Sequence, residues 1–482
     1  MKTKYILFKS IILLLLFAGI SCQDLTESPA GISTSQNFYA TPDQCEAALT
    51  ASMNDLFNTW GGYQNIFGLF PDGHHEWETL SIGSDFAADY WRAHYSAIKN
   101  INAVLKAIKN GNLSTYDPVL VADLEGQAKF LRAFNYFTLV RLWGKIPYIT
   151  EDTPDPVNIP LTPESRMEIA QVYDNIEADL TFAAENMNDY DGSVPARPCL
   201  WTAKSLLAKV YLTRATYPLN ETANYDKAMD MADDVINNGP YSLVSNVEDV
   251  FSTSNKNNSE MIFCFQTTPD DPWMPGIAVA PEEWGGWSSG PVYIPFAESY
   301  PEQPRKHVYI MLDWASDLYD LENSPVMHYT ESGSGVPWMG KYNYPNIAYD
   351  EIEGMSVLNQ PLLRFSDVLL IYAEAANMVN GGPTQLAVDR LNLIIDRANE
   401  GTGVEERADI SMTQDSFDKK VIDERSYELC FENDRIFDVY RKRLLQEIFD
   451  ESILIDYNEE DYLLPIPSFD ATFIGQNPGY EK

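Results

Sequence analysis

Apolar residues recur at spacings of three and four along most of this 482-residue chain. Such a spacing places them on one face of an α-helix. The clearest run predicts a long helix that stops at Gly111; its apolar positions are Trp91, Tyr95, Ile98, Ile101, Leu105 and Ile108. An earlier helix is predicted to begin after Thr41, because Pro42 suits the first helical position and Gln44 completes a capping box.

The helical pattern covers two long parts of the chain and is lost between them. Further helices are predicted near 124–144, 164–187, 200–215, 223–238, 365–379, 384–399 and 415–432. From about 240 to 360, proline, glycine, asparagine and aromatic residues dominate, and no long helical period remains. We therefore expect one mainly α domain over 22–482. Its helical scaffold would span about 40–240 and 361–450, and a loop-rich ligand-binding part would span about 241–360.

One internal similarity suggests that the scaffold is repetitive. The stretches "AKFLRAFNYF" (128–137) and "AKSLLAKVYL" (203–212) carry Ala-Lys, Leu, Ala and Tyr at the same offsets, 75 residues apart. Tetratricopeptide units are about 34 residues long, so the offset is close to two units. Chance similarity between two Ala- and Leu-rich helices is the alternative. The helices predicted on both sides favour a tetratricopeptide-type α-α superhelix.

The first 22 residues have the pattern of a lipoprotein leader. Lys2, Lys4 and Lys9 precede the apolar run 11–18, and the small residues of "GIS" precede Cys22. This order is typical of a secretory signal, and the run is too short for a spanning helix. "GISC" resembles a lipobox, with Gly19 where leucine is more usual. We therefore predict a signal peptide over 1–21 and lipidation of Cys22.

Charge limits the ligands that this chain can bind. The formal net charge is −38, and loss of the three leader lysines moves it to about −41. An acidic surface repels the phosphates of nucleic acid, which need Lys and Arg. A neutral ligand fits the overall charge best, although a local basic pocket could override it. The cysteines Cys45, Cys199, Cys264 and Cys430 have no zinc spacing, and we expect buried free thiols, although sequence does not fix their pairing.

Several stretches together resemble the SusD/RagB family of surface nutrient-binding lipoproteins. They are the leader ending at Cys22, "GQAKFLRAFNYFTLVRLWGKIPY", "RPCLWTAKSLLAKVYL", "PLLRFSDVLLIYAEAAN", "ERSYELCFENDRIFDVYR" and the closing "QNPGY". The resemblance covers nearly the whole chain apart from the middle region. It implies four tetratricopeptide helix pairs, a partner SusC-like TonB-dependent outer-membrane transporter, and ligand binding without catalysis. Asp24 and Glu27 resemble the acidic export signal of such lipoproteins, which implies an outer-membrane protein facing the exterior.

The stretch "ERSYELCFENDRIFDVYR" gathers acidic and basic residues at helical spacing. They are Glu424, Arg425, Glu428, Glu432, Arg435, Asp438 and Arg441. Glutamates four apart suggest a di-metal site, but such a site also needs Glu-x-x-His pairs, which the chain lacks. We therefore predict an ion-pair ladder that locks two helices together.

No other motif predicts a metal, a cofactor or an enzyme. In "GHHEWET", Thr79 stands where a second zinc-binding histidine would be needed after His75. The stretch from Asp189 to Ser193 lacks the later ligands of a calcium loop. The chain has no glycine-rich phosphate loop, and we expect no GxSxG nucleophile elbow. We expect no metal, no cofactor and no catalytic residues.

Tryptophan is the most informative residue type in this chain. Half of the ten tryptophans lie between 270 and 340, where helical order is weakest. A flat aromatic ring covers the C–H face of a sugar, and polar side chains bind its hydroxyls. Tryptophans that only anchor loops to the body are the alternative. We predict ligand contacts from Trp284, Trp287, Trp338, Trp273, Trp77, Asp72 and Trp91.

These observations predict a surface glycan-binding lipoprotein that captures a neutral oligosaccharide and delivers it to its transporter. Two alternatives stay open. The chain could bind a peptide or glycoprotein, or it could dock on the transporter with little ligand affinity of its own. The sequence does not identify the glycan or its linkage, and it leaves calcium binding open.

Overall fold

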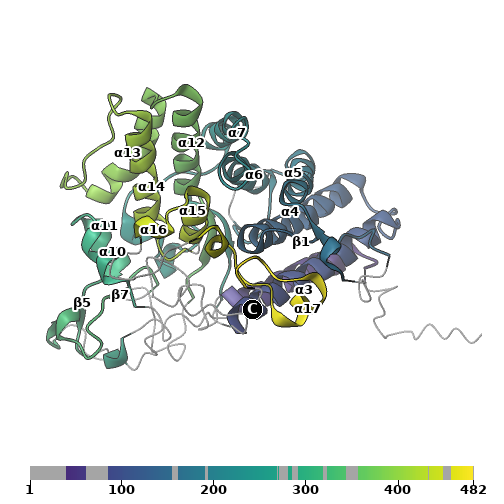
Figure 1. Ribbon diagram of the computed structural model, residues 1–482, viewed down its shortest axis with the longest axis horizontal. Coiled ribbons are helices and arrows are strands. Elements are labelled where there is room, and N and C mark those ends of the chain that lie inside the picture. The colour runs from purple at the N-terminus through teal and green to yellow at the C-terminus, as the bar shows by residue number, and fades with distance from the viewer. Residues whose placement is uncertain are drawn as a thin grey trace, which may run out of the picture.

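The computed structural model describes residues 39–60, 85–154, 161–189, 194–268, 270, 281–284, 291–317, 323–342, 357–432, 434–448 and 458–480. Long helices dominate this part of the chain (Figure 1). The first group is α2 (Pro42–Trp60), α3 (Asp85–Lys109), α4 (Pro118–Trp143), α5 (Ile169–Asn186), α6 (Leu200–Ala215) and α7 (Asn224–Asn238). The second group is α12 (Phe365–Asn380), α13 (Gln385–Asn399), α14 (Gln414–Glu428) and α15 (Arg435–Lys442).

The long helices pack in succession. The helices from α2 to α7 each pack against the next one along the chain, and α7 packs against α12. Helix α12 then packs against both α13 and α14. Figure 1 shows the resulting curved row from α13 through α12, α7, α6 and α5 to α4. The predicted mainly α, tetratricopeptide-like architecture is confirmed.

The helix ends follow the capping rules. Helix α2 begins at Pro42, and the Thr41 hydroxyl accepts a hydrogen bond from the Gln44 N–H at 3.3 Å, as predicted. Helix α3 ends at Lys109, and Gly111 adopts a positive φ of 78° soon after it. At Gly126 in α4, an added Cβ would lie 2.6 Å from Met187 Cγ, so glycine permits close packing of α4 against the end of α5.

The internal similarity corresponds to α4 and α6, but the interpretation of its length was wrong. Ala128 and Ala203 are both fully buried, as are Ala133 and Ala208, so the small residues occupy equivalent packing positions. Among the long helices of the described residues, only α5 lies between the two. The offset therefore spans one helix pair with long connections, and not two compact units.

In the region between α7 and α12, the described residues form only short elements. Its helical turns are α8 (Val247–Val250), η4 (Thr253–Asn255), η5 (Glu282–Trp284), α10 (Ile294–Ser299), α11 (Pro304–Tyr309) and η7 (Tyr329–Glu331). Its strands are β3 (Met261–Phe265), β4 (Ile310–Met311), β5 (Asp313–Ala315), β6 (Val326–His328) and β7 (Trp338–Met339), and β8 (Gln360–Arg364) follows. The pairs β3–β8, β4–β7 and β5–β6 are antiparallel. Strand β3 is buried along its whole length, so the β3–β8 ribbon attaches this region to the scaffold.

The C-terminal segment returns to the first helices. Its short elements are α16 (Leu445–Ile448), η8 (Glu459–Tyr462) and α17 (Ser468–Ile474), and β1 (Ile146–Pro147), η3 (Pro163–Ser165) and β2 (Arg166–Met167) lie between α4 and α5. The Trp143 indole N–H donates to the Pro465 carbonyl at 3.0 Å, and the Asn477 amide donates to the Trp143 carbonyl at 3.1 Å. Figure 1 shows α17 and the C-terminus beside α3. Within the described residues, no helix is long and apolar enough to cross a membrane.

Candidate functional site

Two of the predicted ligand-binding tryptophans are buried in a small aromatic core. Trp284 and Trp338 retain 6% and 1% exposure and pack with Trp314 and Met311. The Trp284 indole N–H donates to the Ala315 carbonyl at 2.7 Å. The expectation that these two rings present a free face was therefore wrong. Between short strands without a helical core of their own, the large rings supply the apolar surface that holds the segment together.

Trp91 is likewise a structural residue. It is 2% exposed, lies at 5.2 Å between ring centres from Trp143, and donates its indole N–H to Asp470 Oδ2 at 2.7 Å. It thereby joins α3, α4 and α17. Its predicted ligand contact is wrong because the ring and its N–H are both occupied within the fold.

The other predicted contacts and the lipidation site lie outside the described residues. These positions are Cys22, Asp72, Trp77, Trp273 and Trp287. His74, His75 and Glu76 lie there as well. Asp189 is described, and its carboxylate accepts the Trp201 indole N–H at 2.5 Å. Among the described residues, no group of three or more His, Cys, Asp or Glu is placed to hold a metal ion.

A cleft of about 420 Å³ opens between α2, α4 and β3. Its apolar lining comes from Leu49, Met53, Phe57, Leu131, Phe263 and Phe265. The Phe57 and Phe265 rings lie 5.6 Å apart, and Phe263 packs edge-on against Phe130 at 5.0 Å. These contacts fix the floor of the cleft, because each ring is held by the scaffold behind it. A cavity of this size with a rigid apolar floor is typical of small-molecule sites.

Polar side chains form the other side of this cleft. Arg197 is 39% exposed at its side chain and pairs with Glu46 at 3.1 Å, and it lies 3.7 Å from Asp123. The Gln127 amide donates to Asp123 at 2.8 Å, and the Asn188 N–H donates to the same carboxylate at 2.7 Å. Asp123 is thus held from several sides and positions Arg197 and Gln127. Thr50, Asn54, Gln266 and Thr268 complete the polar lining.

The cleft lies where the described chain leads into both predicted aromatic segments. Phe57 is close to the end of α2 at Trp60, and the segment with Asp72 and Trp77 follows in sequence. Thr268 precedes the segment with Trp273. Sequence reasoning missed the cleft residues because they come from four separate segments, none of which has a local motif. Only the fold shows that Phe57 and Thr268, which precede the two aromatic segments in sequence, line the same cleft.

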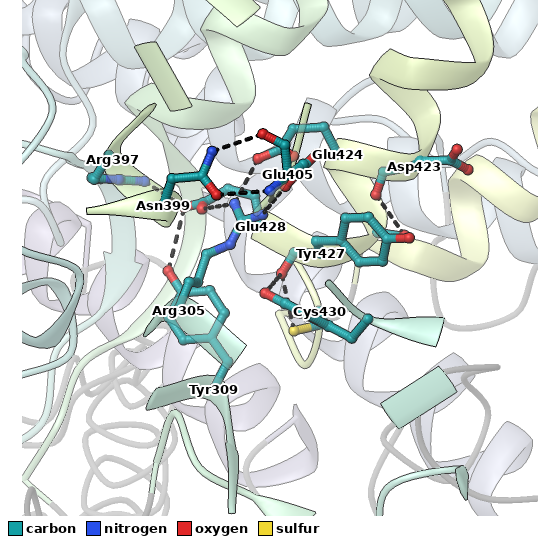
Figure 2. A network of polar contacts seen from close by, with 12 residues as sticks. Arg305, Tyr309, Arg397, Asn399, Glu405, Asp423, Glu424, Tyr427, Glu428 and Cys430 are labelled. Atoms are coloured by element: carbon teal, nitrogen blue, oxygen red, sulfur yellow. Dashed lines mark hydrogen bonds and ion pairs between the residues drawn. The ribbon is translucent and has the colours of Figure 1, made fainter. Parts of the chain in front are cut away.

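The glutamates of the predicted ion-pair ladder belong to a fully buried charge network. Figure 2 shows Arg305 between Glu424 and Glu428. Its guanidinium contacts Glu424 at 2.6 Å and Glu428 at 2.8 Å, and all three side chains are 0% exposed. Glu428 also pairs with Arg364 at 3.0 Å and Arg397 at 2.7 Å. The network therefore joins α11, α13, α14 and β8, which is more than the two helices predicted.

Glu432 reaches this network by a different route from the one predicted. Helix α14 ends at Glu428, and Phe431 has a positive φ of 63°, so Glu432 lies beyond the helix. Its carboxylate still pairs with Arg364 at 2.7 Å and with Lys341 at 2.6 Å. The predicted single helix face is therefore wrong for this residue, because the chain turns after the helix and brings the carboxylate back.

Arg425 and Arg441 form a second buried cluster on α14 and α15. Arg425 contacts Asp367 at 2.7 Å, Asp434 at 2.9 Å and Asp438 at 2.7 Å. Arg441 contacts Asp438 at 2.7 Å and Glu374. Arg435 is the first residue of α15. The second cluster fixes α12, α14 and α15 to one another.

Two carboxylates of these clusters, Glu424 and Glu374, have pKa values shifted in opposite directions. Burial raises the pKa of Glu424 to about 8, because Arg305 is shared with other carboxylates and Glu405 adds repulsion. For Glu374, burial alone would raise the pKa, but Arg441 and Lys442 together lower it to about 2. The four described cysteines are buried free thiols, as expected, and burial raises the pKa of Cys45 to about 11. Of these carboxylates and thiols, only Cys264 lines the cleft. Burial raises the pKa of its thiol well above the usual range.

Comparison with known proteins agrees with this architecture. A family model described as "Starch-binding associating with outer membrane" matches residues 37–212, and a model described as "SusD family" matches residues 321–460. SusD-like protein P2 of Formosa agariphila is 30% identical, and the alignment covers 98% of this chain and 99% of that protein.

Solved structures share the fold. A crystal structure of a SusD homolog from Bacteroides thetaiotaomicron has a TM-score of 0.77 at 20% identity and covers 92% of this chain and 98% of that one. A structure described as a laminarin-binding SusD-like protein has a TM-score of 0.71 at 22% identity and covers 91% and 99%. At these identities the likeness establishes the fold alone. Together with the family models and the Formosa relative, it shows that this chain belongs to the SusD/RagB family.

Proposed function

We propose that the protein binds a neutral oligosaccharide in the cleft between α2, α4 and β3, without chemistry of its own. The observation that carries this proposal is the cleft itself, in which a fixed apolar floor lies beside partly exposed polar groups. A sugar ring has an apolar C–H face and a rim of hydroxyls. The apolar floor would bind the C–H face, and Arg197, Glu46 and Gln127 would bind the hydroxyls.

Two further findings support a neutral carbohydrate. The laminarin-binding protein has the same fold, and its ligand is a carbohydrate. The net charge of −38 opposes polyanionic chains, because long-range repulsion slows and weakens their approach. Trp77, Trp273 and Trp287 stay predicted stacking rings for the same ligand.

An unbiased glycan screen, followed by calorimetry, tests the proposal. Arg197→Ala is expected to weaken binding of the best glycan about tenfold, since a charge-assisted hydrogen bond contributes about 1.5–3 kcal/mol. Arg407→Ala is the matched control, because Arg407 is also exposed and pairs with Asp396 at 3.3 Å but does not line the cleft. Equal affinities for the two variants would contradict the assignment of the cleft. Binding to peptides and to no glycan would favour the peptide-binding alternative.

We further propose that Cys22 is lipidated after removal of residues 1–21 and that the anchored protein serves a SusC-like transporter in the outer membrane. Each buried methylene of an acyl chain contributes about 0.8 kcal/mol, so a lipid group with more than one chain attaches a protein without a spanning helix. Palmitate labelling that survives Cys22→Ser would contradict the anchor. Failure to copurify a TonB-dependent transporter from the native membrane would contradict the partnership.

A further inference from the structure

A second cavity, of about 210 Å³, lies on the scaffold and shares no lining residue with the cleft. It is enclosed by α4, α5, α6 and α15 together with the C-terminal segment around η8. Its lining includes three arginines, Arg141, Arg441 and Arg443. We call this cavity the Arg141 pocket.

Arg141 is held in one position by its neighbours. Its guanidinium carbon lies 3.7 Å from the ring centre of Phe137 and 3.4 Å from that of Phe437, and its Nε–H donates to the Phe137 carbonyl at 3.0 Å. Stacking between two rings restricts the guanidinium plane. The two terminal amino groups remain available as a preformed fork.

The three arginines differ in their counter-ions. Arg441 pairs with Glu374 and Asp438, and Arg443 pairs with Glu459 at 2.6 Å. Among the described residues, no carboxylate lies within 4.0 Å of the Arg141 guanidinium, so its charge has no direct partner there. A partly buried guanidinium is costly to keep charged without a partner. Burial accordingly lowers the pKa of Arg141 to about 10, although Asp434, Asp438 and Asp367 oppose this at longer range.

The rest of the pocket suits an organic anion. Tyr173 lines the pocket. Its hydroxyl makes no hydrogen bond to another described residue, so it can donate to a ligand. Burial raises the pKa of the Tyr173 hydroxyl, although Arg141 and Arg214 oppose this, so the hydroxyl stays protonated. Val140, Ile169 and Leu463 supply apolar walls. The volume of about 210 Å³ has room for several water molecules, which is enough for one small organic acid.

We propose that the Arg141 pocket binds a small organic monocarboxylate, such as a single hexuronic acid. The carboxylate would accept two parallel hydrogen bonds from the Arg141 fork and one from Tyr173 Oη. A monoanion matches the one unpaired charge, whereas a phosphate dianion would bring a charge without a partner. Arg141 would thus allow a small carboxylate to bind, although the net charge of the chain repels polyanions.

Calorimetric titration of the purified protein with sodium glucuronate, acetate, glucose and inorganic phosphate tests this site. Saturable binding is expected for the two carboxylates and not for glucose. Arg141→Met keeps an aliphatic chain between the two rings and should weaken carboxylate binding at least tenfold. Tyr173→Phe should weaken it severalfold, and Arg407→Met, at an exposed ion pair elsewhere, should not change it.

Every outcome that differs from these would contradict the proposed site or its ligand class. Absence of carboxylate binding to the unchanged protein would overturn the site even if Arg141→Met failed to fold. Unaltered binding in folded Arg141→Met and Tyr173→Phe would place the ligand elsewhere. Tighter binding of phosphate than of acetate would overturn the monocarboxylate class. Equal binding of glucose would remove the role of charge.

Discussion

The charge network under α14 and the cleft beside α2 use the same residue types for opposite purposes. In the network, Arg364 and Glu428 have 0% exposed side chains, and each has several partners. In the cleft, Arg197 and Glu46 are 39% and 42% exposed and pair with each other at 3.1 Å. Full burial commits most hydrogen-bonding positions of these side chains to the fold. Partial exposure leaves positions that hold water and can exchange it for a ligand, so the exposure of a charged residue indicates its role better than its type.

Breaking the buried network should have the largest effect. Arg364→Met removes a guanidinium that contacts Glu260 at 2.8 Å, Glu428 at 3.0 Å and Glu432 at 2.7 Å. Three buried carboxylates would lose a counter-ion, and we expect a loss of about 3–5 kcal/mol in the free energy of unfolding. Denaturant titration of the variant beside Arg407→Met measures this. A loss as small as that of the exposed control, within about 0.5 kcal/mol, would show that the network can rearrange.

The pH dependence should separate two carboxylates within the buried region. The pKa of Glu374 is lowered to about 2, so its contribution to stability is present above its unfolded pKa near 4.5 and is lost as pH falls toward 2. The shift of the Glu374 pKa from 4.5 to about 2 corresponds to a contribution of about 3 kcal/mol. The pKa of Glu424 is raised to about 8, so the folded state retains a proton that the unfolded chain loses. Its contribution therefore decreases as pH rises from 4.5 to 8.

Two glutamine variants, measured by denaturant titration at a series of pH values, test these opposite signs. The stability advantage of the unchanged protein over Glu424→Gln should shrink with rising pH, by at most about 1.4 kcal/mol per pH unit. Its advantage over Glu374→Gln should shrink with falling pH below 4.5. Parallel pH profiles for the two variants and the unchanged protein would contradict both pKa shifts.

The scaffold was predictable because its signals are local. The apolar period of Trp91 to Ile108 and the cap at Thr41 specify a helix from neighbouring residues alone. The ion-pair residues were predictable for the same reason, since Glu424 and Glu428 lie one helical turn apart. Their partners were not, because Arg305 and Arg364 are 119 and 64 residues away along the chain.

Burial of the tryptophans could not be predicted from glycine-rich flanks. Flanking glycines indicate a loop, but they do not indicate whether the ring points outward or packs beneath the loop. Trp284 and Trp338 pack inward because β4, β5 and β7 meet around them. The cleft was missed for a related reason, since Phe57, Arg197 and Phe265 converge only through the packing of α2 and β3 on α4.

The smallest effect is expected at Trp287, one of the two tryptophans of the "EEWGGW" stretch, and Trp284 is its structural contrast. Trp284 is buried and bonded to Ala315, so Trp284→Ala should cost about 3–5 kcal/mol of stability. Trp287 stays the predicted stacking platform, and Trp287→Ala should weaken glycan binding about tenfold, or about 1.4 kcal/mol, with nearly unchanged Tm. Calorimetry and thermal unfolding on both variants give the two readouts. A large fall in Tm for Trp287→Ala would show a second structural ring, and glycan binding would then depend on the cleft and the remaining aromatic segments.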